Sequence, residues 1–198
     1  FVAPAVRSVV SAHFGIPFDQ ASAFMAGLLK SLGFNRVFDF SFAADLTVIE
    51  ETTEFMKRVS AGSAVGTHPG GDFLPHGRLP QFTSCCPAWV NFVERRYPDL
   101  IPYLSSCKSP QMMMGAVVKN HFAQSAGIPR ENLYVVSVVP CLAKKSEAAR
   151  PEFAPDGIRD VDAVLTSSEM LEMVRLAMID PDDIQPAPFD EPYRHVSG

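Results

Sequence analysis

The chain has 198 residues, of which 47% are hydrophobic, with a mean hydropathy of +0.08 and a formal net charge of −5. This length and apolar content suffice for one substantial domain with a buried core, and they exclude a disordered chain. The negative charge, without any basic cluster, argues against a nucleic-acid surface, and no apolar run approaches the length of a membrane span.

Short β-like runs alternate with amphipathic helical stretches, which predicts an α/β fold with a parallel sheet flanked by helices. Residues 1–2 are expected to end a strand. Residues 19–32 predict a helix, because apolar side chains recur at helical spacing and Gly33 follows as a stop signal. Residues 36–40 predict a strand.

Residues 44–59 predict a second helix with two different sides. One side carries apolar residues that are expected to face a core: Leu46, Ile49, Met56 and Val59. The other side carries Glu51, Glu54 and Arg58, whose spacing of three and four makes them neighbours. From the pattern alone, this second side is most simply a solvated ion-pair face.

In the middle of the chain the alternation of predicted strands and helices stops, and two adjacent cysteines follow. Residues 61–81 are rich in glycine and proline and predict a long surface loop or insertion. Residues 82–84 predict a short strand that leads into Cys85 and Cys86. Pro87 then stands at the expected first position of a helix.

The second half repeats the alternation. The expected elements are a helix from Pro110 capped by Ser109, a strand at 133–139, a helix at 143–150, a strand at 161–165 and a helix at 170–179. Thr166 and Glu169 have the spacing of a capping box before that last helix. From residue 181 the chain is acidic and proline-rich, and 181–198 is expected to be a truncated linker.

Four cysteines indicate the chemistry: Cys85, Cys86, Cys107 and Cys141. Disulfide frameworks favour small secreted domains with more cysteines per residue, so reduced thiols or metal ligands are the better interpretation. Cys85-Cys86 and Cys141 each follow a predicted strand and precede a helix N-terminus, which favours the metal-binding thiolate. They would supply two corners of an iron–sulfur cluster, with buried structural cysteines as the alternative.

Two runs, Thr83–Trp89 (TSCCPAW) and Pro140–Glu147 (PCLAKKSE), resemble the first two of the three signature motifs of the H-cluster domain of FeFe hydrogenases. Four further runs resemble the same domain in the same order: Val2–Arg7, Leu32–Glu54, Leu104–Gln111 and Arg150–Val164. The resemblance implies a partial H-cluster domain over 1–198, mostly one lobe of a two-lobed catalytic domain. Since the third motif is absent, the chain is expected to be a fragment that is inactive alone.

The resemblance implies the reversible reduction of protons to hydrogen, with a role for each matching residue. Cys86 and Cys141 would ligate the 4Fe–4S part of the H-cluster. Cys85 would be the proton donor and acceptor beside the bridging azadithiolate of the di-iron subcluster. The proton path to Cys85 would contain Ser105, Glu51, Glu54 and Arg58. The carbonyl and cyanide ligands would be held by Lys144, Gln111, Ala3 and Pro4.

The implied partners are a ferredoxin or another electron carrier, NAD(P)-linked subunits and maturation proteins. The implied location is the cytoplasm of an anaerobic bacterium, with the periplasm left open. Two alternatives remain: an iron–sulfur assembly or hydrogen-sensing relative without high turnover, and a thiol-redox or structural module without metal. Cys85 beside Glu51, Glu54 and Ser105 favours a catalytic parent, because assembly proteins of this fold would not need a relay cysteine or Lys144.

Overall fold

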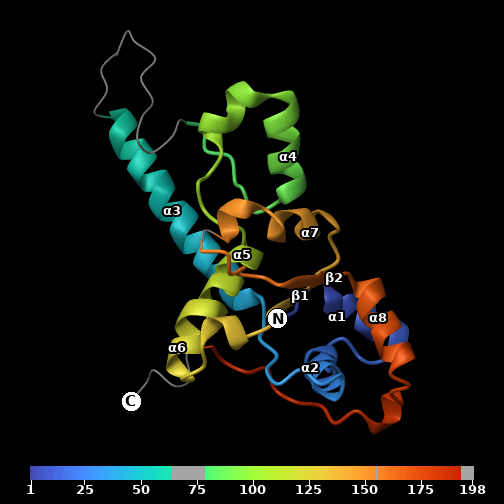
Figure 1. The fold of residues 1–198 in the computed structure, drawn as a ribbon. Helices are drawn as coiled ribbons and strands as arrows, with labels where there is room; N and C mark the ends of the chain where they lie inside the picture. The colour runs from blue at the N-terminus through green and yellow to red at the C-terminus, as the bar shows by residue number, and fades with distance from the viewer. Residues whose placement is uncertain (64–78, 155, 193–198) are drawn as a thin grey trace. The chain divides into compact units, whose positions relative to one another are not determined.

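The computed structural model describes residues 1–63, 79–154 and 156–192. The chain divides into two compact units, which we call unit 1 (Phe1–Phe42 with Met114–Gly198) and unit 2 (Ala43–Met113). It passes between them within two helices, α3 (Ser41–Ser63) and α5 (Pro110–Ala116) (Figure 1). Each unit is described by itself below.

Unit 1 is built on a small parallel sheet. Strand β1 (Val136–Val138) pairs in parallel with β2 (Ala163–Leu165). Single parallel bridges extend the sheet beyond β1, joining Val2 to Val138 and to Asp39, and Phe38 to Asp190. The predicted parallel sheet with flanking helices is therefore confirmed. Of the strand expected at 36–40, only these bridges form.

The two named strands are shorter than the apolar runs that contain them. The N–H of Val135 donates to the side chain of Asp162 (2.7 Å) instead of to a neighbouring strand, so the ladder starts one residue later. At the other end Pro140 has no N–H to donate, which stops the ladder. Ser137 and Val138 are buried, as expected for a strand covered on both faces.

Helices cover this sheet, and their ends follow local signals. The α-helices of unit 1 are α1 (Val6–Phe14), α2 (Ala21–Ser31), α6 (Ala123–Ser125), α7 (Ala143–Ala148) and α8 (Ser167–Leu176). A π-helical segment, Val117–Phe122, joins α5 to α6, and 3-10 turns occupy Arg130–Asn132, Pro151–Phe153 and Pro181–Asp183. The capping box is confirmed, since Thr166 and Glu169 exchange both hydrogen bonds at the start of α8.

The chain after residue 183 lies along unit 1. Ala187 donates its N–H to the carbonyl of Ala23 in α2 (2.9 Å). Gly27 permits this approach, because an added Cβ there would be 2.1 Å from the carbonyl oxygen of Gln185. The described part of 181–198 therefore differs from the expected linker: it is a packed segment.

Unit 2 contains most of α3, then α4 (Pro87–Arg96), a 3-10 turn (Pro98–Tyr103) and the start of α5. The expected start of α4 at Pro87 is confirmed. The expected core side of α3 is wrong at two positions, since Ile49 is 59% exposed and Met56 is 56% exposed. The expected solvated side is also wrong, because Arg58 is only 2% exposed.

Two further expectations concern surfaces. The loop expected at 61–81 lies mainly outside the described residues, and its first three residues belong to α3. In the part of the chain that the structure describes, no helix is long and apolar enough to cross a membrane.

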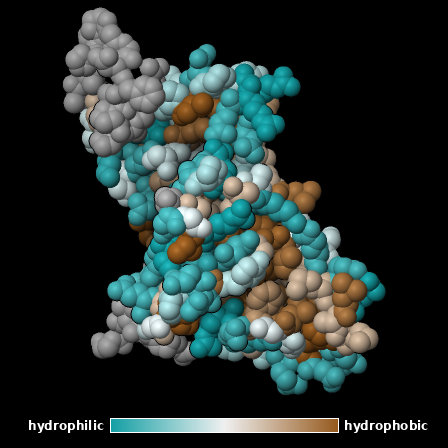
Figure 2. Space-filling view, in the orientation of Figure 1, coloured by the Kyte–Doolittle hydropathy of each residue, from teal (hydrophilic) through white to brown (hydrophobic). Residues whose placement is uncertain are grey.

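Figure 2 shows hydrophobic residues gathered at the lower right of the view, over the region of unit 1 that carries α8.

Candidate functional site

A single parallel bridge organises the site in unit 2. Phe82 bridges Leu104 through two backbone hydrogen bonds: the N–H of Phe82 donates to Tyr103 (2.8 Å), and the N–H of Ser105 donates to Phe82 (2.7 Å). Because the paired segments run parallel, residues 83–86 and 105–107 emerge at the same edge. The side of α3 that carries Glu51, Glu54 and Arg58 contacts this edge through hydrogen bonds.

The carboxylate of Glu54 is the centre of the cluster. It accepts hydrogen bonds from the hydroxyl of Ser105 (2.6 Å) and from the guanidinium of Arg58 (2.6 Å). Ser106 donates its backbone N–H to both carboxylate oxygens (3.1 Å each) and its hydroxyl to one of them (3.2 Å). Burial acts to raise the pKa of Glu54, but these hydrogen bonds outweigh it, so the pKa of Glu54 lies below its ordinary value.

Arg58 binds two backbone carbonyls in addition to the Glu54 carboxylate. Its guanidinium also donates to the carbonyls of Tyr103 (3.1 Å) and Leu104 (2.5 Å), at the end of the bridged segment. A guanidinium stays protonated in proteins, so Arg58 can hold Glu54 and screen its charge but cannot pass on a proton. The structure therefore places Arg58 as a fixed cation beside Glu54.

Glu51 contacts the segment that carries the adjacent cysteines. One of its carboxylate oxygens accepts the backbone N–H of Ser84 (3.1 Å), and its carbonyl accepts the side-chain amide of Gln81 (3.0 Å). Ser84 directly precedes Cys85, so Glu51 is tied to the loop that presents this thiol. The structure thus joins Glu51 to the segment before Cys85 and Glu54 to Ser105, through hydrogen bonds that spacing alone does not reveal.

None of the four cysteines, all of which lie in the described part of the chain, is in a disulfide. Cys85 and Cys86 are exposed, whereas Cys107 and Cys141 are partly buried. Cys86 is the N-cap residue of α4, directly before its first turn. Among the described residues, no group of three or more histidine, cysteine or acidic side chains could hold a metal.

The second set of expected site residues lies in unit 1, at the carboxyl ends of two adjacent strands. Ala3 follows Val2, and its N–H donates to Val138 (2.9 Å), while Cys141 and Lys144 follow β1. Lys144 is 8% exposed, and its ammonium pairs with Glu147 at 2.9 Å. Pro4 is exposed beside Ala3. This strand-end arrangement is the usual place for ligand-binding groups in a parallel sheet.

Gln111 lies in α5 and is fully buried. The hydroxyl of Ser109 accepts the N–H of Met112 (3.4 Å), as expected for a residue that caps this helix. Four residues that sequence reasoning did not assign also contact the site residues: Ser84, Ser106, Cys107 and Glu147. Of these, only Glu147 had a usable signal, its i,i+3 spacing from Lys144.

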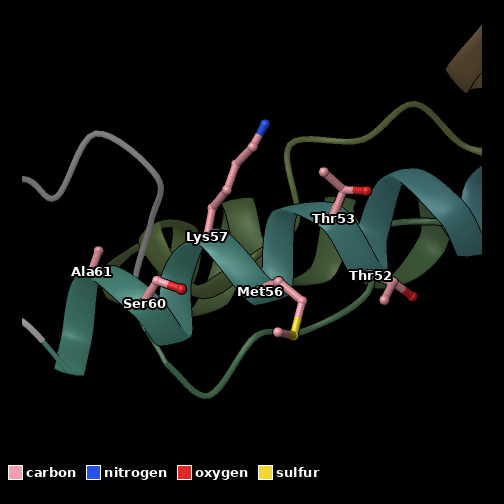
Figure 3. A pocket seen from close by; sticks show the side chains of 6 residues that line it. All are labelled: Thr52, Thr53, Met56, Lys57, Ser60 and Ala61. Atoms are coloured by element: carbon pink, nitrogen blue, oxygen red, sulfur yellow. The ribbon is translucent and has the colours of Figure 1, made fainter.

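Figure 3 shows a pocket on α3 that does not belong to the cluster. It is lined by Thr52, Thr53, Met56, Lys57, Ser60 and Ala61. Their helical spacing places all of them except Ala61 on a different side of α3 from Glu51, Glu54 and Arg58. Lys57 is the charged member of this lining, and its side chain extends away from the helix in Figure 3.

The whole chain, residues 1–198, matches the family model of the iron only hydrogenase large subunit, C-terminal domain. The chain belongs to this family. It is 47% identical to the NADP-reducing hydrogenase subunit HndD of Solidesulfovibrio fructosivorans, over 99% of this chain and 32% of that protein. It is also 36% identical to the cytosolic Fe-S cluster assembly factor narfl of Danio rerio, over 100% of this chain and 46% of that protein.

Solved structures show the same fold. A variant of the FeFe-hydrogenase HydA1 from Chlamydomonas reinhardtii matches with a TM-score of 0.83 and 38% identity, over 96% of this chain and 45% of that one. Another match, with a TM-score of 0.83 and 41% identity, is an FeFe-hydrogenase studied for damage to its H cluster 2Fe subcluster. The chain thus spans less than half the length of these relatives, and the expected family is confirmed.

Proposed function

We propose that this chain is part of a hydrogenase that catalyses the reversible reduction of protons to molecular hydrogen. The observation that supports this most is the hydrogen-bonded cluster of unit 2. Glu54 binds Ser105 at 2.6 Å, and Glu51 binds the N–H of Ser84, next to the exposed thiol of Cys85. A carboxylate, a hydroxyl and a thiol in succession are groups that can hold and pass on a proton.

In this proposal each side chain has a separate task. Glu54 exchanges protons with solvent, since its carboxylate reaches the exposed Ser106. Ser105 accepts and donates through one hydroxyl, and Glu51 carries the proton on towards Cys85. The thiol of Cys85 delivers it to the reaction centre and can take it back. Arg58 positions Glu54 and keeps its resting form ionised.

The chemistry of the assigned side chains, two thiols with an ammonium and an amide, is the chemistry that binding of the H-cluster would need. Cys86 and Cys141 are free and at least partly exposed, so each can bind iron, and we assign both to the 4Fe–4S part. Carbonyl and cyanide ligands would be held by Lys144, Gln111, Ala3 and Pro4. When bound, the cluster supplies the electrons and the iron at which hydrogen is made or split. The azadithiolate bridge is the group that would meet Cys85.

An iron–sulfur assembly protein is the second candidate, because two relatives named as cytosolic Fe-S cluster assembly factors, one of them as a probable one, are 35–36% identical over nearly the whole chain. Cys85 together with Glu51 and Glu54 favours the hydrogenase, since scaffold or assembly work needs no path for protons. A redox partner subunit or a ferredoxin is proposed as the electron carrier, by analogy with the NADP-reducing relative. The location is proposed as cytoplasmic, although one relative is named as periplasmic.

The test is hydrogen turnover by the full-length protein that carries this chain, produced anaerobically with hydrogenase maturation proteins. We expect iron and sulfide to be bound, and hydrogen to be evolved from a low-potential reductant and consumed with an oxidised acceptor. Bound iron without hydrogen turnover in either direction would instead support the assembly function. A protein that binds no iron would contradict both candidates.

A further inference from the structure

Cys107 has no role in the function proposed above, yet its three polar groups contact three different parts of the cluster. Its thiol donates to the Glu54 carboxylate at 3.6 Å. Its backbone N–H donates to the hydroxyl of Ser105 at 3.1 Å. Its carbonyl accepts the hydroxyl of Ser84 at 2.8 Å. Because Ser84 precedes Cys85, residue 107 links the carboxylate, the serine and the cysteine loop.

Two of these contacts close a ring together with the hydrogen bond between Ser105 and Glu54. The Ser105 hydroxyl donates to the same carboxylate oxygen, Oε2 of Glu54, that accepts the Cys107 thiol. The N–H of Cys107 in turn occupies one acceptor position on the Ser105 hydroxyl. A serine hydroxyl has two such positions, so one is left to accept a proton while its hydrogen points at Glu54. The ring thus fixes the direction of the hydroxyl.

Resting on the proposed function, we propose that Cys107 is a positioning residue of the proton path. Its thiol and its N–H hold the Glu54 carboxylate and the Ser105 hydroxyl against each other. A thiol is a weak hydrogen-bond donor. It can therefore orient the Glu54 carboxylate and still leave this group able to take up a proton. The thiol contact is the part of this arrangement that depends on the side chain, because the backbone contacts survive a substitution.

The surrounding charges keep the thiol in its donor form. Burial raises the pKa of Cys107, and the charges of Glu54 and Glu51 add to this, against a lowering by the Ser105 hydrogen bond. Glu54 itself faces the guanidinium of Arg58 on α3 and the neutral donors of the 105–107 segment. Loss of the thiol therefore removes one donor to the charged carboxylate and leaves the ion pair with Arg58 intact.

The test measures the protonation of Glu54 in the full-length protein by infrared spectroscopy across pH. The carboxyl C=O band of protonated Glu54 is assigned by its absence in Glu54→Gln. In Cys107→Ala we expect the midpoint of this band to move up by about 0.5 pH unit, because the ionised form has lost a donor. Cys107→Ser is the matched control, and its hydroxyl should keep the midpoint within about 0.2 pH unit of the unsubstituted protein. Equal midpoints for the alanine variant and the unsubstituted protein would overturn the proposal.

A second measurement needs no alanine variant. The S–H stretching band of Cys107, assigned by its loss in Cys107→Ser, should shift as Glu54 takes up its proton, since the acceptor of the thiol changes. An S–H band whose frequency stays constant while Glu54 is titrated would overturn the proposal. Both spectra are independent of turnover. A shifted midpoint in a protein without hydrogen turnover would contradict only the proposed function, and an unshifted one in an active protein would contradict only the role of Cys107.

Discussion

Ser105 and Glu54 are 51 residues apart in the chain, and the hydroxyl of the first lies 2.6 Å from the carboxylate of the second. Each of these two residues is also held in place by a contact with a third residue. Ser105 is held because its N–H continues the bridge to Phe82, and Glu54 is held by Arg58 from the next turn of α3. The backbone of unit 2 therefore fixes this contact in advance, and the proposed proton path would need such a preformed contact for rapid transfer.

Substitution of Cys85 by serine separates proton delivery from iron binding. A hydroxyl at this position is a much weaker acid than a thiol, so we expect hydrogen turnover to fall by at least about 100-fold. Iron content and the iron–sulfur spectrum should stay unchanged. The matched control is the neighbouring Cys86→Ser, which should lower the iron content. Turnover retained in Cys85→Ser would remove Cys85 from the path.

Replacement of Arg58 by alanine should destabilise the protein strongly. The change leaves the Glu54 carboxylate and two backbone carbonyls without their cation, and loss of one partner from a buried ion pair costs about 3 kcal/mol or more. Chemical denaturation measures this as a lower free energy of unfolding. Lys57→Ala is the control, because Lys57 is exposed on the same helix and should change the free energy by no more than about 0.5 kcal/mol. Similar values for both variants would contradict the structural role of Arg58.

The contribution of Glu54 to stability should depend on pH in one direction. Its pKa in the folded protein lies below the ordinary value of 4.5. The stabilisation is therefore fully present above that value and is lost as the pH falls through the folded pKa. Denaturation curves of the unsubstituted protein and Glu54→Gln should differ at pH 7 and converge in acid. A difference that grows as the pH falls would mean that the carboxylic acid, and not the carboxylate, is the stabilised form.

Gly27→Ala should detach the packed segment after residue 183. Alanine normally favours a helix over glycine, but here its Cβ would lie 2.1 Å from the carbonyl of Gln185. We expect a loss of about 1–3 kcal/mol in the free energy of unfolding, as for other overpacked sites. Ser22→Ala, in the same helix, is the control and should be close to neutral. A stabilised Gly27→Ala would show that the segment does not pack there.

Elements with local start and stop signals were predictable from the sequence. Pro87 marks the first turn of α4, and Thr166 with Glu169 marks the start of α8. The strands were less predictable from the sequence, since their length depends on pairing partners that are distant in the chain. Phe38, for example, bridges Asp190, and no pattern within 36–40 contains that information.

The candidate site was predictable as a set of residues but not as a set of contacts. The spacing of Glu51, Glu54 and Arg58 showed that they share a side of α3, but that side was equally consistent with solvent. Its burial follows from the 82–104 bridge, which places carbonyls within reach of Arg58. The thiol of Cys107 reaches Glu54 for the same reason, so neither contact had a signal in the local sequence.

The two units differ in how they are composed of the chain, and this has a consequence for the order of assembly during synthesis. Unit 2 is one continuous run, Ala43–Met113, so all its partners have left the ribosome early. Unit 1 joins residues near its N-terminal end to residues far downstream: the N–H of Val37 binds the side chain of Asp190, 153 residues later. Pairings this distant form late. The cluster around Glu54 can therefore be in place before the bridge between Phe38 and Asp190 completes the sheet of unit 1.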